Sequence, residues 1–189
     1  MSPRATLHLR IALATGIPFA VFMQLGAGLI GWGGFRSPWY FLSNLLFFGA
    51  LMSLTIGSAH VAAVKRLLGR SPTPSDLEVY QAGATVLAKP PARAFESVHE
   101  ALSSRPDTQV VGVDATTGWL RARSGANWKA WGYDIDVDVR SANGGSQVLI
   151  AARPRLRAQL CDYGESLRIV ADCLARVASP TESPVPADA

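Results

Sequence analysis

The stretch "YDIDVDVRSANGGSQVLIAA", Tyr133 to Ala152, decides the fold. Apolar and polar side chains alternate strictly in its first half, which is typical of a half-buried β-strand. Asn143 and Gly144 then form a hairpin signal, and "SQVLIAA" returns as the next strand. The stretch therefore predicts an antiparallel hairpin with one apolar face and one charged face.

Further elements are predicted on both sides of this hairpin. Short strands are expected at 84–89, 108–114 and 119–124, and a helix at 90–104 begins with prolines in its first turn. A second helix follows Asp162, with an apolar set at helical spacing: Leu167, Val170, Ala171, Leu174 and Val177. The order β-α-β-β-β-β-α predicts an α+β domain, an antiparallel sheet with helices on one face. A solid core is favoured over a cavity, because a domain of ~100 residues has little apolar surface to spare.

Two long uncharged runs precede this domain. Residues 11–35 and 39–64 contain no Asp, Glu, Lys or Arg. A helix rises about 1.5 Å per residue, so either run can cross a hydrocarbon core about 30 Å thick. The sequence therefore predicts a transmembrane helical hairpin over 1–68 (helices about 11–35 and 39–64), a linker over 69–78, a soluble α+β domain over 79–178 and a disordered tail over 179–189.

The charges favour one orientation of the hairpin. All 14 acidic residues lie beyond residue 70, which leaves the soluble part near −2 and gives no argument for nucleic acid. Arginines and lysines flank the outer ends of the two runs, whereas Arg36 alone lies in the turn between them. The positive-inside rule then predicts a multi-pass protein of the cytoplasmic (inner) membrane with both termini in the cytoplasm.

A stripe of small residues, Gly49, Ser53 and Gly57, recurs every four positions in the second run. Such a stripe permits close approach of another helix. Packing within the hairpin is favoured, and association with a second copy or another membrane protein is the alternative.

Chemistry-bearing residues are sparse. Cys161 and Cys173 have no second cysteine pair and no nearby histidine at ligand spacing, so we expect no metal site and reduced thiols. The three histidines, His8, His60 and His99, lie far apart in the sequence. No nucleophile elbow or phosphate-binding loop occurs. We therefore expect no catalytic residues and no cofactor.

The row of aspartates and the tryptophans on the predicted strands and loops can each be interpreted as structural or as functional. Asp134, Asp136 and Asp138 share one strand face and are expected to pair with Arg121 and Arg123 rather than hold a cation, because straight strands do not converge their oxygens. The tryptophans at 119, 128 and 131 suit core packing or base stacking. Trp128 and Trp131, with Lys129, also suit contact with a membrane interface.

The segment "ARPRLRAQLCDYGES", 152–166, joins the last strand to the last helix. Asp162 and Glu165 have capping-box spacing, and Gly164 permits close approach to the helix start. We expect Arg153 or Arg155 to tie the strand end to the Asp162 cap. An anion site is the alternative, although Asp162 would already place negative charge there.

This segment resembles the C-terminal signature of a bacterial family catalogued as domain of unknown function 1499. The matching residues are Arg153, Arg155, Asp162, Tyr163, Gly164 and Arg168. The resemblance covers 79–177 in element order, with Ser166 where family members commonly have Asn. It implies the fold, and these residues form a candidate structural or anion site.

Three functions remain open. The first is a membrane-anchored, non-catalytic binding or scaffold module, with the lipid bilayer as a partner. The alternative is lipid or hydrophobic-ligand handling by the α+β domain. The third is a membrane-associated hydrolase or transferase, which the lack of a nucleophile or metal motif places last. A closed apolar pocket would favour the second function, and convergent titratable groups in a pocket would favour the third.

Overall fold

The computed structural model describes residues 3–30 and 37–178, in two compact units. Unit 1 contains Met1–Glu78 together with Leu160–Gly164, and unit 2 contains Val79–Gln159 and Glu165–Ala189. The predicted turn around Arg36 and the predicted tail over 179–189 lie outside the described residues.

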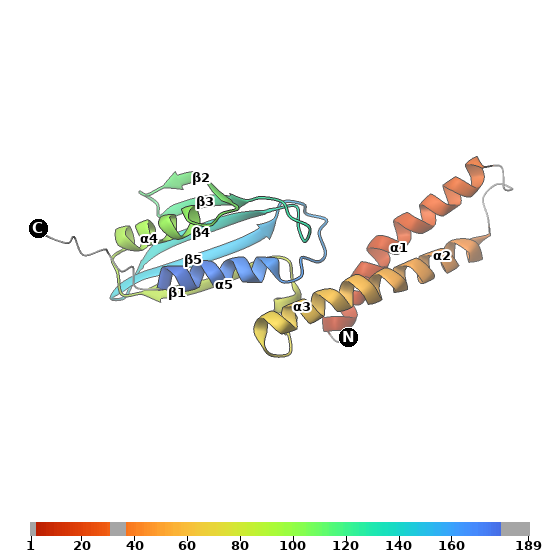
Figure 1. Cartoon of the computed structure of the whole chain (residues 1–189), viewed down its shortest axis with the longest axis horizontal. Coiled ribbons are helices and arrows are strands. Elements are labelled where there is room, and N and C mark those ends of the chain that lie inside the picture. Colours follow the sequence, from red (N-terminus) through yellow and green to blue (C-terminus); the bar gives the residue numbers. More distant parts are fainter. Residues whose placement is uncertain (1–2, 31–36, 179–189) are drawn as a thin grey trace, which may run out of the picture. The chain divides into compact units, whose positions relative to one another are not determined.

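Unit 2 is built on one five-stranded antiparallel sheet, with the spatial order β1-β5-β4-β3-β2. The strands are β1 (Gln81–Leu87), β2 (Thr108–Asp114), β3 (Trp119–Ser124), β4 (Tyr133–Ala142) and β5 (Gly145–Pro154). Helices α4 (Pro91–Ser103) and α5 (Glu165–Ala178) pack together on one face of the sheet (Figure 1). The predicted order of elements and the α+β class are confirmed.

The β4–β5 hairpin is the middle of this sheet, and its register follows the alternation in the sequence. Ala142 pairs with Gly145 across a two-residue turn, in which Gly144 takes φ +78°. That left-handed conformation is strained for side chains other than a few small polar ones, so glycine suits it. Tyr133, Ile135 and Val137 are at most 1% exposed and point toward the helices.

The core lies between the sheet and the two helices. Phe95, Val98 and Leu102 of α4 are buried, as predicted. The predicted face of α5 is partly wrong, because Leu167 is only half-buried and Ala171 is exposed. The buried stripe of α5 consists of Ile169, Val170, Cys173 and Val177. Apolar residues occur on more than one side of this helix, so their spacing alone did not determine which side faces the sheet.

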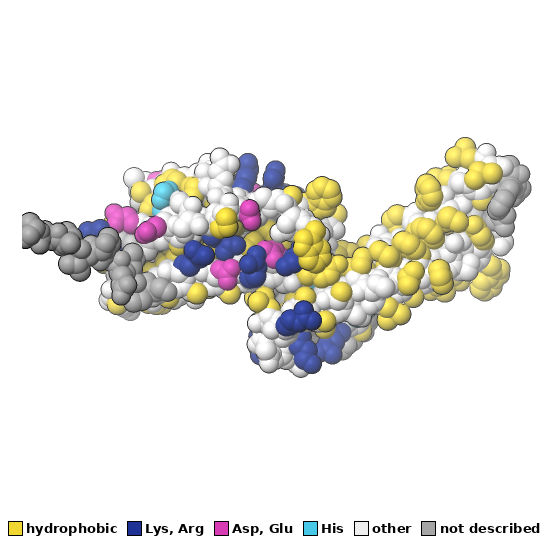
Figure 2. All heavy atoms as spheres, in the orientation of Figure 1, with side chains coloured by type: hydrophobic (Ala, Val, Ile, Leu, Met, Phe, Trp, Pro, Cys, Tyr) yellow, Lys and Arg dark blue, Asp and Glu magenta, His cyan; other side chains and the backbone are white. Residues whose placement is uncertain are grey.

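Unit 1 contains two helical runs. The first is α1 (Pro3–Leu29), and the second runs continuously through α2 (Pro38–Met52), a π-helical turn η1 (Ser53–Gly57) and α3 (Ser58–Leu68). Both runs are long and apolar enough, by length and composition, to cross a membrane, and 22% of each apolar window is buried within the chain. Their surface in Figure 2 is largely hydrophobic.

The small-residue stripe packs inside this hairpin. A Cβ atom on Gly49 would lie 2.6 Å from the backbone oxygen of Ala12, and one on Gly16 would lie 2.6 Å from that of Leu45. The helices therefore touch backbone to backbone at these positions. Association of Gly49, Ser53 and Gly57 with a second chain stays a prediction.

The π-helical turn lies where His8 of α1 meets the second run. Nδ1 of His8 is 3.0 Å from the carbonyl oxygen of Ser53, and the Ser53 hydroxyl donates to the carbonyl oxygen of His8 at 2.9 Å. A side chain inserted beside the backbone ladder is a recognised cause of such turns. His8 therefore accounts for the irregularity at Ser53–Gly57.

The predicted linker, 69–78, forms a compact turn held by hydrogen bonds to the carboxylate of Asp76. Gly69 ends α3 with φ +67°, and a short 3-10 turn η2 (Ser75–Leu77) follows. Asp76 accepts hydrogen bonds from Arg70 at 2.8 Å and from the Thr73 amide at 2.7 Å. The hydrogen bond from Arg70, and those from Thr73, outweigh burial and lower the pKa of Asp76 to about 2.

Candidate functional site

The face of the sheet opposite the helices carries a ladder of ion pairs across three strands. On it, Nε of Arg121 is 2.6 Å from Asp136, Nε of Arg123 is 3.1 Å from Asp134, and Arg153 of β5 reaches the second oxygen of Asp136 at 3.1 Å. The predicted cross-strand pairing of Arg121 and Arg123 is confirmed. We call this surface the open face.

The expected tie between Arg153 and Asp162 is wrong. β5 pairs with β4 so that Arg153 lies opposite Asp134 and beside Asp136. The strand register thus commits Arg153 to the open face, whereas Asp162 is separated from it by the loop that follows Pro154. Arg155 lies in that loop, where its amide donates to the carbonyl oxygen of Gly132 at 3.0 Å.

Asp162 instead belongs to a buried polar cluster of unit 1. It is fully buried, its Oδ1 accepts a hydrogen bond from the Gly164 amide at 3.0 Å, and it lies 3.9 Å from Nδ1 of His60. The amide of Tyr163 donates to the same His60 nitrogen at 3.0 Å, so His60 carries its proton on Nε2 and donates to the Leu77 carbonyl oxygen. The cluster fixes five residues, Leu160–Gly164, on α3.

Gly164 and Cys161 show how tightly this segment is held. Gly164 has φ +77°, and a Cβ atom there would lie 3.3 Å from the side chain of Val64. Burial, together with the charge of Asp162, raises the pKa of the Cys161 thiol to about 12. Cys161 is therefore a protonated, poorly nucleophilic thiol at neutral pH.

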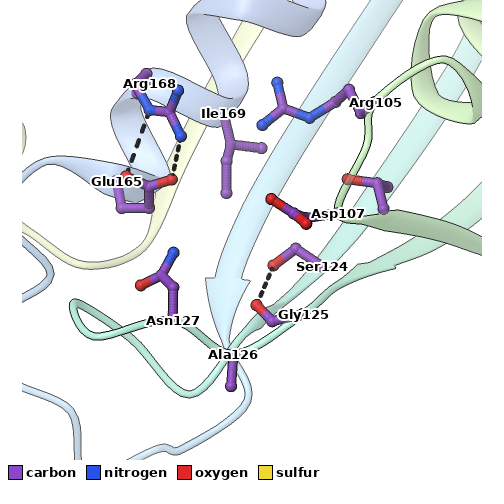
Figure 3. Close-up of a pocket in the computed structure, with 10 residues that line it drawn as sticks. Arg105, Asp107, Ser124, Gly125, Ala126, Asn127, Glu165, Arg168 and Ile169 are labelled. Carbon is purple, nitrogen blue, oxygen red and sulfur yellow. Dashed lines mark hydrogen bonds and ion pairs between the residues drawn. The ribbon is translucent and has the colours of Figure 1, made fainter.

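Arg168, the last of the sequence-predicted residues, lines a different site. A pocket of about 260 Å³ lies in unit 2 where α5 begins, between the α4–β2 loop and the β3–β4 loop. Figure 3 shows Arg168 and Glu165 on the first turn of α5, with Arg105 extending toward Ile169 from the other side. Asp107, Thr108, Ser124 and Asn127 complete its polar lining.

Glu165 is the most buried carboxylate of this pocket, with 5% of its side chain exposed. Nζ of Lys129 lies 3.2 Å from its Oε2, and the guanidinium of Arg168 pairs with the same carboxylate. Burial opposes ionisation, but the hydrogen bonds and charges of Arg168 and Lys129 outweigh it and lower the pKa of Glu165. Glu165 is therefore a fixed anion that positions two cations.

Arg105 forms the opposite wall. Its side chain is 12% exposed, and its Nη1 is 3.3 Å from Asp172 of α5. Its Nε atom is buried and finds no hydrogen-bond partner among the described residues. A buried donor without a partner costs about 1–3 kcal/mol.

Sequence reasoning singled out two pocket residues, Arg168 and, for another role, Glu165, and missed the rest. Arg105 and Asp107 flank a proline after α4, and Asn127 lies in a glycine-containing loop, with no motif that marks either segment. The Oδ1 atom of Asn127 accepts hydrogen bonds from the backbone amides of Lys129 and Ala130, at 2.8 and 3.0 Å. These two bonds shape the pocket rim. The asparagine itself was the signal available in the sequence, because Asn side chains favour turns of this kind.

A second pocket of about 380 Å³ lies near the start of α4 and is lined by Phe95, Thr116, Thr117 and neighbouring residues. Its charged lining residue, Arg140, pairs with Asp138. Within residues 3–30 and 37–178, no group of three or more His, Cys, Asp or Glu side chains is placed to hold a metal ion.

No family model and no curated protein matches the chain. Solved structures similar to part of it include Ara h 8.0201, with 10% identity and a TM-score of 0.42 over 52% of this chain and 94% of that chain. DynU16, from the dynemicin biosynthetic locus, has 13% identity and a TM-score of 0.39 over 53% of this chain and 46% of its own. TTHA0849 from Thermus thermophilus has 12% identity and a TM-score of 0.33, over 52% of this chain and 94% of that chain.

Proposed function

We propose that the chain is a membrane-anchored binding protein whose α+β domain holds an amphiphilic ligand by an anionic head group. The observation that carries the proposal is the pocket at the start of α5, which is lined by two arginines, Arg105 and Arg168. This proposal adopts lipid or hydrophobic-ligand handling in place of a bare scaffold.

Two arginines suit the head group. Arg105 is nearly buried, and Arg168 is held by Glu165 while half of its side chain stays exposed. A guanidinium already fixed by another carboxylate loses less freedom when it binds an acceptor such as a carboxylate or phosphate. Asp107 is exposed to solvent at the rim, where water screens its charge.

The apolar part of the ligand would start at Ile169 and Ala126, which also line the pocket. A volume of about 260 Å³ accommodates a head group and the first carbons of a chain. A purely catalytic role is less suited to the pocket, because its buried carboxylate, Glu165, is already held as an anion by two cations.

We further propose that the two long helices span the cytoplasmic membrane, with both termini and the α+β domain in the cytoplasm. Each helix is mostly exposed within the chain and bears large apolar side chains, as lipid contact requires. Arg4, Arg10, Lys65 and Arg66 lie at the end predicted to be cytoplasmic. Membership of the domain of unknown function 1499 family belongs to the same proposal.

Binding of octanoate to the full chain in detergent tests the head-group site, with uncharged octanol as the matched probe. We expect octanoate to bind and octanol to bind more weakly, because only the carboxylate can meet the arginines. Arg168→Ala should weaken octanoate about tenfold, the size of one charged hydrogen bond. Titration calorimetry measures both affinities.

Arg93→Ala is the matched control for this titration, since Arg93 is an exposed arginine of α4 outside the pocket and pairs with Glu96. Its octanoate affinity should equal that of the original chain. Equal binding of octanol and octanoate, or an unchanged affinity in Arg168→Ala, would contradict the proposed head-group site.

A binding or scaffold function without a small ligand is the second candidate, and a specific surface favours it. The β1–β5 side of the open face is apolar and exposed, with Ala82, Ala84, Val86 and Leu149. Val86 is 66% exposed on an edge strand, where another protein can dock. If Val86→Lys releases a protein that co-purifies with the full chain while octanoate fails to bind, this second function replaces the first.

A further inference from the structure

One end of unit 2 exposes large apolar side chains from two adjacent loops. Trp128 is 81% exposed, Trp131 is 68% exposed, and Leu156 of the β5–α5 loop is 44% exposed. The loops meet through the hydrogen bond from the Arg155 amide to the Gly132 carbonyl oxygen. We call Trp128, Trp131, Arg155, Leu156 and Arg157 the tip.

The tip is presented on a well-ordered turn. Asn127 and Ala130 form an isolated antiparallel bridge, and the Asn127 side chain accepts two amides of the same turn. Nζ of Lys129 lies over the ring of Trp128, 5.6 Å from its centroid, while it pairs with Glu165. A ring held outward by a structured turn loses little freedom when it enters another phase.

Positive charge surrounds these apolar side chains. Arg155 and Arg157 are both exposed, and neither makes an ion pair within the part of the chain that the structure describes. Tryptophan with arginine is the combination that membrane–water interfaces favour, since the ring enters the head-group region and the cation meets lipid phosphate.

Chain connectivity favours the same occupant. Three residues after Arg157 the chain enters Leu160–Gly164, which belongs to the unit that contains the two long apolar helices. Three residues span about 10 Å at most, so the tip is tethered to that unit by a very short segment.

We propose that the tip docks on the surface of an anionic bilayer. This inference rests on the proposed membrane anchor and adds a second point of membrane contact, by which the α+β domain is held at the surface. Trp128 and Trp131 enter the head-group region, and Arg155 and Arg157 bind the phosphates of anionic lipids.

Tryptophan quenching in the full chain tests this docking. The chain is reconstituted into vesicles of phosphatidylcholine and phosphatidylglycerol, with the lipids brominated near the head groups. Trp128→Phe with Trp131→Phe removes emitters in contact with lipid, so the quenched fraction of the emission should fall. Trp119→Phe removes an emitter on the open face, away from the tip, so the quenched fraction should rise.

Charge is tested in the same vesicles. Arg155→Glu with Arg157→Glu should lower the quenched fraction, and added salt should lower it in the original chain. Arg93→Glu, a charge reversal on α4, should leave it unchanged. A quenched fraction that rises in the Trp128→Phe, Trp131→Phe variant, as it does in Trp119→Phe, would overturn docking of the tip.

Flotation separates the two proposals. If the original chain floats with vesicles after alkaline extraction but the tip variants quench like the Trp119→Phe control, the anchor stands and the docked tip is overturned. If the chain does not float under any condition, both are overturned, because neither the helices nor the tip then holds it on lipid.

Discussion

The two faces of β4 place opposite chemistry on one strand. Ile135 and Val137 are at most 1% exposed beneath α4 and α5, while Asp134 and Asp136, the residues beside them in sequence, keep 25% and 27% of their side chains exposed. The buried inner side chains, Tyr133, Ile135, Val137 and Val139, are hydrophobic, and every outer carboxylate faces an arginine. The same backbone therefore separates a face that stabilises the fold from a face that mainly fixes charge.

The difference teaches that the number of contacts is a poor guide to stability. The ion pairs of the open face are short and regular, but water competes for both partners and salt screens them. The inner side chains make no directional bonds, yet their removal leaves a cavity that the core cannot fill. Substitutions on the two faces should therefore differ several-fold in their effect.

The largest effect is expected at Ile135. Ile135→Ala should lower the free energy of unfolding by about 2–5 kcal/mol, because it removes three buried carbons from beneath the helices. Ile135→Val, the matched control, should cost about 0.5–1.5 kcal/mol. Urea titration of the full chain in detergent, followed by tryptophan fluorescence, measures both. Equal losses of unfolding free energy in Ile135→Ala and Ile135→Val would contradict the claim that inner-face packing stabilises the fold.

An intermediate effect is expected at Glu165, a carboxylate unlike those of β4 because it is nearly buried. Glu165→Gln should cost about 1–3 kcal/mol at neutral pH, since Lys129 and Arg168 lose their shared anion. The same titration measures it. A loss no larger than that of an open-face carboxylate would show that burial does not distinguish the two regions.

The pH dependence of Glu165 sharpens this point. Its folded pKa is lowered below the ordinary 4.5, so its stabilising contribution is complete above about pH 4.5 and is lost as pH falls through the folded pKa. The difference between the original chain and Glu165→Gln should therefore narrow toward strong acid. Urea midpoints collected from neutral to acidic pH check the sign, and a gap that widens in acid would contradict it.

The smallest effect is expected on the open face. Asp136→Asn removes the charge partner of Arg121 and Arg153 but leaves its side chain in place. The loss should be less than about a fifth of that of Ile135→Ala, and high salt should abolish it. Midpoints at low and high salt measure this. A salt-independent loss as large as that of Ile135→Ala would mean that the ladder stabilises the fold.

Strand alternation made most of unit 2 predictable from sequence. Tyr133, Ile135 and Val137 repeat every two residues, and the pleat of a strand converts that period directly into two faces. Helix α5 was harder, since Leu167 and Ile169 are both apolar and only packing against the sheet decides which one is buried.

Partners were predictable only where the register fixes them. Arg121 and Arg123 follow from the pairing of neighbouring strands, but Arg153 was missed because the second strand of the hairpin was expected to end at Ala152. The pocket at α5 joins Arg105 to Arg168, 63 positions later, and no local spacing reports such a meeting. The contact of Tyr163 with His60 is equally remote in sequence.

The return of Leu160–Gly164 to unit 1 has a consequence for synthesis of the chain. His60 leaves the ribosome about 100 residues before Tyr163, the residue whose amide its ring nitrogen accepts. At roughly 5–20 residues per second, that interval lasts about 5–20 s. The helical unit therefore lacks one of its segments while all five strands of the sheet are being synthesised. It is complete only when Leu160–Gly164, which follows β5, has been made. A nascent chain arrested before Leu160 should hold its helices without the final contact that completes them.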